Sequence, residues 1–504
     1  MHPKAWLACL KKLIETLGFR AESSFLLDAT MKIALSLPRT VHRRSQFRPF
    51  SPLFTLLFCL CLTAPIPLSA EPKEYDLDSA IAVALENNRL RTISQHSLAV
   101  AEAQYRQAAS SYWPTLSLNL GFQRRDEIAN FEYPELNFDI APGMLPPVTV
   151  PAQQIDLLGR NSSLHSLEMT YPLYTGGKRS SLVEQAKIGI DIANHEVRRT
   201  DLQIVRDVKR YFFAALYTQQ LVELAEEITL SFDVLQDITQ AFYESGSNSV
   251  DKLDLLRSRL AHTLAAATLA ELKSKHQSAL AALSFAMGLD WQEEIRLGSD
   301  RYPSSLDKAS LDQMIEEALN FNPEIQKLAL AVDVYGAKVE EARSGYYPTL
   351  ALVGSYNDFN TNIDGGLNTQ ANRRSWSIGI GLHMNLFEGG RTRHMVSAAK
   401  TEQQKIEQQR LLLSEGVATK VKSLFLKIQA TMKQIEITEQ SLITSKENRD
   451  LTSRAYQTGA VDTQQVIESD LLDAMVQANH FRAMHDKALH LAEVTYLLGK
   501  EAYE

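Results

Sequence analysis

The chain has 504 residues, of which 45% are hydrophobic and 22% charged, and its formal net charge is -8. This mild acidity disfavours a nucleic-acid-binding protein, because such proteins carry a basic face or stripe for the phosphate backbone. Beyond residue 70 there is no run of about 18 apolar residues, which a membrane-spanning helix would need. If the mature chain crosses a membrane, strands must do so.

The first 70 residues have the pattern of a secretory leader. Several arginines precede an apolar run over residues 53–62, and the segment ending at Ala70 supplies a small-residue cleavage site. Met31 is a better start than the first residue, since what precedes it does not resemble the basic segment of a leader. We therefore expect export, a mature N-terminus at or near Glu71 and no lipid anchor. The cysteines all fall in this leader, so the mature chain needs no disulfide framework: Cys9, Cys59 and Cys61.

The mature chain has the pattern of two versions of one unit. An internal two-fold repeat relates residues 71–289 to residues 311–504, with a joint over 290–310. Three short motifs recur in the same order in both units: an aromatic-Pro-Thr-Leu segment, a Gly-Gly pair and a Tyr-x-x-Gly turn. They lie at 112–116 and 346–350, at 176–177 and 389–390, and at 243–246 and 456–459. Two copies of one motif order predict two copies of one structural unit.

Within each unit, helical spacing comes first and strand alternation follows. In the first unit apolar residues recur every three or four positions from Leu77 to Tyr105, which predicts one helix, and Pro114 ends it. Apolar and polar residues then alternate with a period of two. Segments of about ten such residues, at equivalent positions in an exported chain, are typical of outer-membrane barrel strands. The predicted strand pairs are about 115–123 with 163–174, and 349–357 with 375–387.

The last predicted strand has the clearest alternation. Its large apolar residues occupy every second position, and the residues between them are small or polar. The apolar set should face lipid, because barrel strands turn apolar side chains outward and polar ones toward a water-filled lumen. The predicted lipid-facing residues are Trp376, Ile378, Ile380 and Leu382.

Very long helical patterns follow the strand pairs. From Lys178 to Glu244 there is no proline, and a similar pattern in the second unit includes residues 411–442. Such length without caps indicates a coiled coil or a helical array, and about 65 residues would span roughly 100 Å. Return helices are predicted over 250–287 and 462–498. Glycines mark the expected strand-to-helix and helix-to-helix turns: Gly176, Gly177, Gly389, Gly390, Gly246 and Gly459.

The number of strands bears on the assembly. Four strands cannot close on themselves, and an open sheet edge cannot lie in hydrocarbon because its amide groups would lack hydrogen bonds. Two chains would give eight strands, a barrel whose interior the side chains nearly fill. Three chains would give twelve strands and leave room for a lumen, which the polar inward residues would suit.

Together the duplicated strand pairs, the aromatic-Pro-Thr-Leu entry, the Gly-Gly junctions and the Tyr-x-x-Gly turns resemble the TolC-like outer-membrane efflux protein family. The resemblance covers about Glu74 to Gly499. It implies an α+β membrane protein: a homotrimer whose four strands per chain complete a 12-stranded β-barrel in outer-membrane lipid, continuous with a long periplasmic coiled-coil α-barrel. It also implies passive exit of drugs, metals or polypeptides, delivered in a Gram-negative bacterium by an inner-membrane RND or ABC pump and a periplasmic adaptor (a membrane fusion protein).

The resemblance also implies a constriction at the periplasmic end. Family members narrow the tunnel there with acidic residues that follow the Tyr-x-x-Gly turn. The matching positions in the second unit are Gln465 and Glu468, so an amide replaces the first acid. The first unit offers Asp251 and Asp254 in an uncertain register. Three-fold symmetry would triple each carboxylate and favour cations. The alternative for Glu468 is an ordinary solvated carboxylate on a helix.

Enzyme chemistry finds no support in the residues. There is no nucleophile–base arrangement, phosphate loop or helical pair of histidines at metal-ligand spacing, so we expect no catalysis, cofactor or metal. The main alternative function is a periplasmic coiled-coil adaptor of an efflux or secretion system, which would share the leader and the long helices. An adaptor should carry a compact β domain instead of duplicated strand pairs. A secreted hydrolase would need convergent acid, base or metal-binding residues.

Overall fold

The computed structural model describes residues 73–140, 143–144, 146–246, 250–298, 302–303, 310–362 and 373–499. The chain divides into two units, Met1–Ala70 and Glu71–Glu504, and the architecture below is that of the second. The expected leader, its cleavage site and the start at Met31 lie outside the described residues. None of the helices in the described ranges is long and apolar enough to cross a membrane.

The helices occur in the same order in the two halves of the chain: two shorter helices, a long helix and a return helix. The long helices α6 and α10 have 67 residues each, and the return helices α7 and α11 have 36 each. Their bounds are α4 (Leu77–Asn87), α5 (Arg89–Ser110), α6 (Lys178–Glu244), α7 (Lys252–Met287), α8 (Leu311–Phe321), α9 (Pro323–Arg343), α10 (Arg391–Gln457) and α11 (Thr463–Leu498), with a short 3-10 turn η2 (Ser344–Tyr346).

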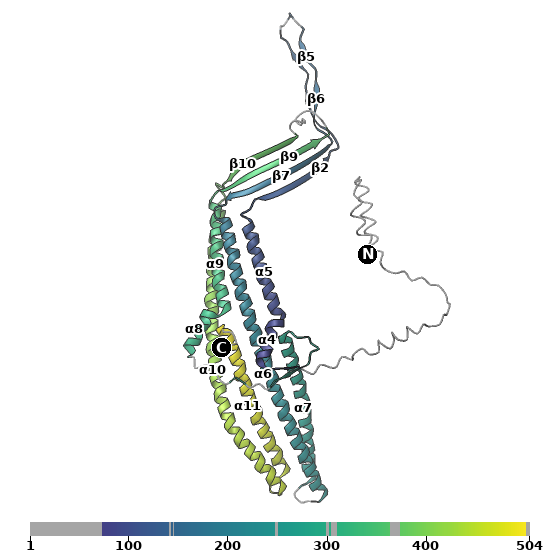
Figure 1. Cartoon of the computed structure of the whole chain (residues 1–504), viewed down its shortest axis with the longest axis vertical. Helices are drawn as coiled ribbons and strands as arrows, with labels where there is room; N and C mark the ends of the chain where they lie inside the picture. Colours follow the sequence, from purple (N-terminus) through teal and green to yellow (C-terminus); the bar gives the residue numbers. More distant parts are fainter. Residues whose placement is uncertain are drawn as a thin grey trace, which may run out of the picture. The chain divides into compact units, whose positions relative to one another are not determined.

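The strands form one four-stranded sheet and three two-stranded pairs within the described residues. The strands are β1 (Lys73–Tyr75), β2 (Thr115–Arg124), β3 (Ala129–Tyr133), β4 (Leu136–Phe138), β5 (Val148–Val150), β6 (Gln153–Leu158), β7 (Asn161–Tyr174), β8 (Ile295–Leu297), β9 (Thr349–Thr361) and β10 (Arg374–His383). The large sheet has the order β10-β9-β7-β2, and every neighbouring pair is antiparallel. It lies at one end of the long helices (Figure 1), and β2 and β10 are its edges.

The first helix of each half is broken at an asparagine, where the sequence predicted one continuous helix. Asn88 is extended, with ψ 124°, and its side chain caps α5 by accepting a hydrogen bond from the Leu90 N–H at 2.9 Å. Its amide also donates to the carbonyl of Ala286, near the end of α7, at 2.7 Å. Asn322 does the same for α9, and its amide donates to the Leu497 carbonyl at 3.0 Å. A tertiary contact, invisible to periodicity, therefore fixes both breaks.

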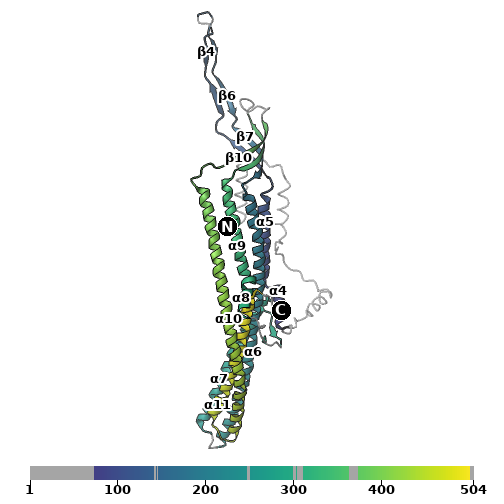
Figure 2. The ribbon, with the colours of Figure 1, turned by 90° about the vertical axis from the view of Figure 1, so that its left-hand side faces the viewer.

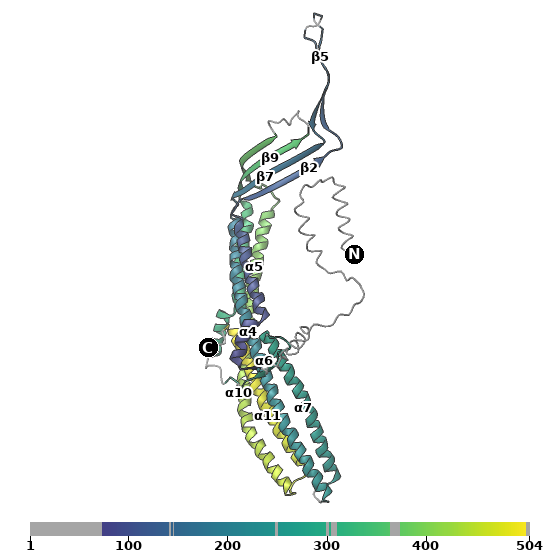
Figure 3. The ribbon, with the colours of Figure 1, turned by 45° about the vertical axis from the view of Figure 1, so that its right-hand side comes forward.

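The helices bury apolar residues where they pack on one another. Helix α6 packs on α5, α7, α9 and α11, and α9 lies between α6 and α10 (Figure 2). One core joins α4, α6 and α7 around the fully buried Phe212, and another joins α8, α10 and α11 around Val421. Away from the sheet, the hairpins α6–α7 and α10–α11 lie side by side (Figure 3). Leu224 and Val466 contribute to a third core between them.

A long β ribbon between β2 and β7 was not expected from the sequence. Strand β3 pairs with β6, and β4 with β5, both antiparallel, so the chain from Ala129 to Leu158 folds back on itself (Figure 1). The pairing has an irregularity after Ala129, and prolines such as Pro134 and Pro151 interrupt the short strands. These interruptions hide the period of two that would have predicted strands.

Candidate functional site

One face of the four-stranded sheet is apolar across all four strands. The register pairs Leu118 with Leu167, Leu167 with Tyr356, and Tyr356 with Trp376. Directly opposite residues point to the same face, so these side chains form one row. The predicted lipid-facing residues belong to this face and are largely exposed in the single chain: Trp376 74%, Ile378 64%, Ile380 68% and Leu382 68%. So much contiguous apolar surface requires a cover.

The opposite face of the sheet is polar. A row adjacent to the apolar one pairs Ser117 with Glu168, Glu168 with Ser355, and Ser355 with Ser377. The hydroxyls of Ser355 and Ser377 are 2.9 Å apart and hydrogen-bonded. On the polar face Ser166 is only 4% exposed, whereas its neighbour Leu167 on the apolar face is 39% exposed. The sheet therefore separates its large apolar side chains from its hydroxyl and carboxylate side chains, and its apolar face is exposed in the single chain.

Glycines make the strand-to-helix turns. Gly177 has φ +91° and caps the start of α6, and Gly390 has φ +82° and caps α10. Their predecessors Gly176 and Gly389 also have positive φ, which side chains other than glycine adopt at a cost. At Gly176 a Cβ atom would lie 2.8 Å from the carbonyl oxygen of Ser344, so the backbone of the first half closely approaches the second. The Gly-Gly motif thus joins sheet and helices.

The Tyr-x-x-Gly motif works differently at the two helix tips. Both tip glycines, Gly246 and Gly459, have φ +71°. Tyr456 is 4% exposed, and its hydroxyl contacts those of Thr239 at 2.8 Å and Thr463 at 3.1 Å. It therefore ties α10 to both α6 and α11. Its counterpart in the first half, Tyr243, is 40% exposed.

Most of the predicted constriction residues are engaged in helix capping. Asp251 and Asp254 form a reciprocal capping box at the start of α7, in which each carboxylate accepts a hydrogen bond from the other's backbone N–H. Gln465 forms the same box with Asp462 at the start of α11. Glu468 lies one turn further along α11 and is exposed, and its Oε1 accepts a hydrogen bond from the Gln464 amide at 2.7 Å.

A buried ionic cluster lies behind this tip and was missed by the sequence analysis. Arg449 of α10 donates to Asp473 at 3.0 Å and Glu227 at 2.7 Å, and approaches Asp470 at 3.8 Å. Asp470 and Asp473 are 2% and 1% exposed. Burial raises the pKa of Asp470, although Ser231 donates to it at 2.7 Å. The partners come from α6, α10 and α11, so no local spacing in the sequence could indicate them.

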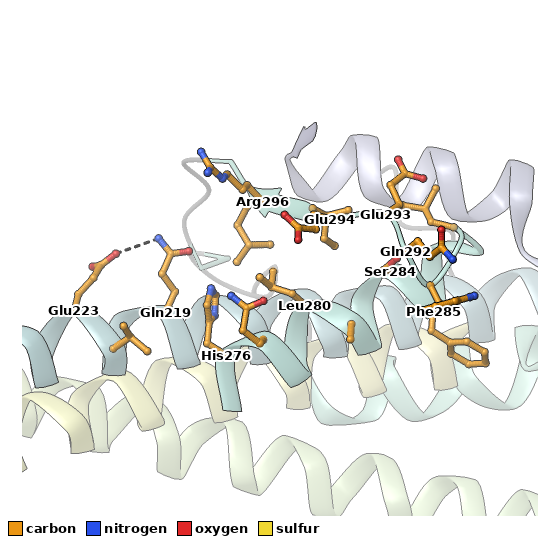
Figure 4. A pocket seen from close by; sticks show the side chains of 17 residues that line it. Gln219, Glu223, His276, Leu280, Ser284, Phe285, Gln292, Glu293, Glu294 and Arg296 are labelled. Carbon is orange, nitrogen blue, oxygen red and sulfur yellow. Dashed lines mark hydrogen bonds between the residues drawn. The ribbon is translucent and has the colours of Figure 1, made fainter. Parts of the chain in front are cut away.

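A separate pocket of about 900 Å³ lies between α6, α7 and the segment around β8 (Figure 4). Gln219 donates to Glu223 at 3.0 Å on one side of it, while Glu293, Glu294 and Arg296 approach from the other. The histidine that lines the pocket is His276, and its Nδ1 atom is hydrogen-bonded to the hydroxyl of Thr218 at 3.2 Å. Across the described ranges, no group of three or more His, Cys, Asp or Glu residues is arranged to hold a metal ion.

Two curated relatives have related sequences. The chain is 23% identical to outer membrane protein TolC of Vibrio cholerae over 317 residues, which covers 61% of this chain and 69% of that protein. It is also 23% identical to the solvent efflux pump outer membrane protein SrpC of Pseudomonas putida over 359 residues, covering 70% and 68%.

The fold has a solved counterpart. The crystal structure of a membrane protein from Pseudomonas aeruginosa matches with a TM-score of 0.69 at 18% identity, over 84% of this chain and 93% of that one. Residues 80–289 and 314–500 match the family described as outer membrane efflux protein, which is most of the chain. The chain therefore belongs to the outer membrane efflux protein family: it is located in the outer membrane and extends into the periplasm.

Proposed function

We propose that three copies of this chain form one outer-membrane efflux channel, and that their sheets close a twelve-stranded barrel. The main support for this proposal is the four-stranded sheet. Its apolar face is exposed, and each of its edge strands, β2 and β10, pairs with another strand on one side only within the described residues. In hydrocarbon the free N–H and C=O groups of both edges would lack partners. Adjacent chains would supply the missing strand to each other.

Strand direction supports this closure. Every neighbouring pair in the order β10-β9-β7-β2 is antiparallel, so β10 of one chain would lie antiparallel to β2 of the next. Closed membrane barrels are generally antiparallel and even-numbered, and twelve strands leave a lumen. The polar row containing Ser117 and Ser377 would then line water, and the row containing Leu118 and Trp376 would face lipid.

The helices would continue the channel into the periplasm. We take residues 71–289 and 311–504 as the two structural repeats and 290–310 as their joint, so that three chains contribute six long hairpins to an α-barrel. An apolar groove of about 690 Å³ along α6, α7 and α11 supports such an assembly, because neighbouring helices could cover it. Among the residues lining it are Leu260, Leu264, Leu471 and Met475.

The cargo would leave passively, and the chain would not be an enzyme. An inner-membrane RND or ABC pump would supply the energy, and a periplasmic adaptor would join it to the helix tips. The relative described as a solvent efflux pump outer membrane protein supports a role of this kind. An adaptor could open the tips only by binding the open arrangement more tightly than the closed one.

Glu468 is the residue that we assign to the constriction. Asp251, Asp254 and Gln465 have their side chains in capping boxes, whereas Glu468 is exposed and belongs to no capping box. Three symmetry-related carboxylates near one axis would attract cations and repel each other. Packing of the surrounding helices, including the contacts of Tyr456 and Arg449, would then have to hold the tips closed.

The test is single-channel recording on the purified protein in planar bilayers, with its mass measured in detergent. We expect a trimeric mass and discrete channels that prefer cations. Glu468→Lys should reduce cation preference and weaken block by multivalent cations, because it replaces three negative charges with three positive ones.

The matched control is Glu316→Lys, which makes the same charge change at an exposed position of α8. It should leave selectivity unchanged. A monomeric protein without conductance would refute the channel assembly. A trimeric channel in which Glu468→Lys behaves like Glu316→Lys would refute only the role of Glu468.

A further inference from the structure

Arginines cluster at the end of the sheet that lies away from the helices. Arg124 is the last residue of β2 and Arg374 the first of β10. Arg373 precedes Arg374, and the backbone N–H of Arg125 donates to the Arg160 carbonyl at 2.7 Å. Because the helices extend into the periplasm, this end of the sheet is at the cell surface.

Two of these arginines belong to the apolar face of the sheet. Even-numbered residues of β2 form that face, so Arg124 follows Phe122 on it. Even-numbered residues of β10 do the same, so Arg374 precedes Trp376 on it. Phe122 and Trp376 are 76% and 74% exposed. An aromatic ring followed by a long cationic side chain is the pattern of a membrane–water interface, where the ring lies at the edge of the hydrocarbon and the charge reaches the headgroups.

The positive charge of this cluster is only partly neutralised. Arg373 and Arg374 share one carboxylate, Asp358, at 2.8 and 3.4 Å. No salt bridge is recorded for Arg124 among the residues that the structure describes. Asp126 follows the cluster, but its Oδ1 accepts a hydrogen bond from the Glu127 N–H in the local turn. Asp358 lies on β9, which is not adjacent to β2, so Arg124 at the opposite edge of the sheet does not share this carboxylate.

We propose that Arg124 of one chain and Arg374 of the next form a binding site for the phosphates of a phosphorylated glycolipid, the lipid A that occupies the outer leaflet. The site rests on the proposed trimer, because closure brings the edges β2 and β10 together and places both residues at the cell-surface end of one seam. Guanidinium groups bind phosphate through paired N–H donors, and lipid A carries phosphates at this depth beside acyl chains. Phe122 and Trp376 would contact those chains.

The charge of the β ribbon agrees with this boundary. Residues 126–159 contain six acidic residues and no lysine or arginine. An acidic segment is repelled by a phosphate layer, whereas the arginines at its base are attracted to it. The sign of the charge thus changes where the chain would leave the headgroup layer for open water.

The experiment is native mass spectrometry of the detergent-purified protein, titrated with bisphosphorylated lipid A. Two comparison ligands are titrated in parallel. One is lipid A from which the phosphates have been removed, and the other is inorganic pyrophosphate alone. The double variant Arg124→Gln/Arg374→Gln should bind bisphosphorylated lipid A at least about tenfold more weakly than the unmodified protein, since charge-assisted hydrogen bonds are lost. Arg124→Lys/Arg374→Lys should retain part of the binding, because the charge remains while the paired donors are lost.

The matched control is Arg393→Gln, an exposed arginine at the start of α10 and so at the opposite membrane surface. It should bind lipid A as the unmodified protein does. Unchanged lipid A binding by a trimeric glutamine variant would overturn the site, as would equal binding of dephosphorylated lipid A. Pyrophosphate binding as tight as that of lipid A would overturn the lipid as the ligand. Absence of a trimer in all variants would overturn the proposed function and the seam site with it.

Discussion

The sheet and the helical part of this chain distribute apolar side chains in opposite ways. In the helices the apolar residues point inward, and Phe212 and Val421 are fully buried. In the sheet the apolar residues point outward, and Ile380 and Trp376 are exposed while Ser166 is covered. The two regions are therefore suited to two different solvents. Water surrounds the helices, and the outer face of the sheet needs an apolar medium.

Exposure of an apolar side chain therefore has a different meaning in the helices and in the sheet. An exposed leucine on a helix is ordinary, because apolar atoms make up much of any protein surface. A continuous apolar row across four strands, opposite a polar row, indicates instead that the two faces of the sheet contact different media. Substitutions of the same kind should therefore have different effects in the two regions.

The largest effect is expected at the buried ionic cluster of the helical part. Arg449→Met would leave Asp470 and Asp473 buried without their cation, which should destabilise the protein by about 3 to 5 kcal/mol. Urea unfolding followed by circular dichroism measures this. Arg454→Met, at an exposed position of the same helix, is the control and should change the stability by less than about 0.5 kcal/mol. Equal effects would show that the cluster carries no stabilisation.

In the sheet, Ile380→Arg should be the most harmful type of change. A cation on the lipid face near the bilayer midplane should cost about 2 to 4 kcal/mol. Gly381→Arg lies one residue away on the polar face, where the nearest atom to a new Cβ is 4.0 Å distant, and should be tolerated. Unfolding from liposomes measures both. Greater damage from Gly381→Arg would reverse the assignment of the faces.

The two helix tips give a smaller contrast. Tyr456→Phe removes the hydroxyl that contacts Thr239 and Thr463, which should cost about 1 kcal/mol. Tyr243→Phe changes the equivalent residue of the first half, which is 40% exposed, and should have almost no effect. Urea midpoints of the two variants provide the comparison. If both variants lose equal stability, the buried hydroxyl of the second tip has no special role.

The smallest effect concerns pH and the helices α6 and α9. Hydrogen bonds from Arg199 and Lys327 lower the pKa of Glu196 to about 2, from an ordinary value of 4.5. A lowered carboxyl pKa stabilises the folded state above about pH 4.5, and this contribution is lost as the pH falls toward 2. Glu196→Gln should therefore lower the free energy of unfolding at pH 6 by at most about 1 kcal/mol, and by less at pH 3. A difference that grows on acidification would contradict this account.

Features with a local cause could be predicted from the sequence. The long helix α6 begins directly after Gly177, and α10 directly after Gly390, because paired glycines provide the positive φ of each turn. The faces of β10 follow from its strict period of two. The assignment of Trp376 to lipid stays a prediction.

Features with a non-local cause could not be predicted. The break at Asn88 depends on a hydrogen bond to Ala286, which is 198 positions away. Arg449 meets its carboxylates only because three helices pack together. The capping of α7 by Asp251 depends on backbone geometry that an acidic residue alone does not reveal. In the ribbon, prolines replace the regular alternation on which strand prediction relies.

A nitroxide scan of β10 tests directly whether the two faces of the sheet contact different media. The cysteines of the sequence all lie within its first 70 residues, so single cysteines can be introduced from Trp376 to Leu382 and spin-labelled in bilayers. We expect the spin labels at even positions to be relaxed by oxygen dissolved in lipid, and those at odd positions by a water-soluble nickel reagent. Equal accessibility to the water-soluble reagent at all seven positions would contradict it.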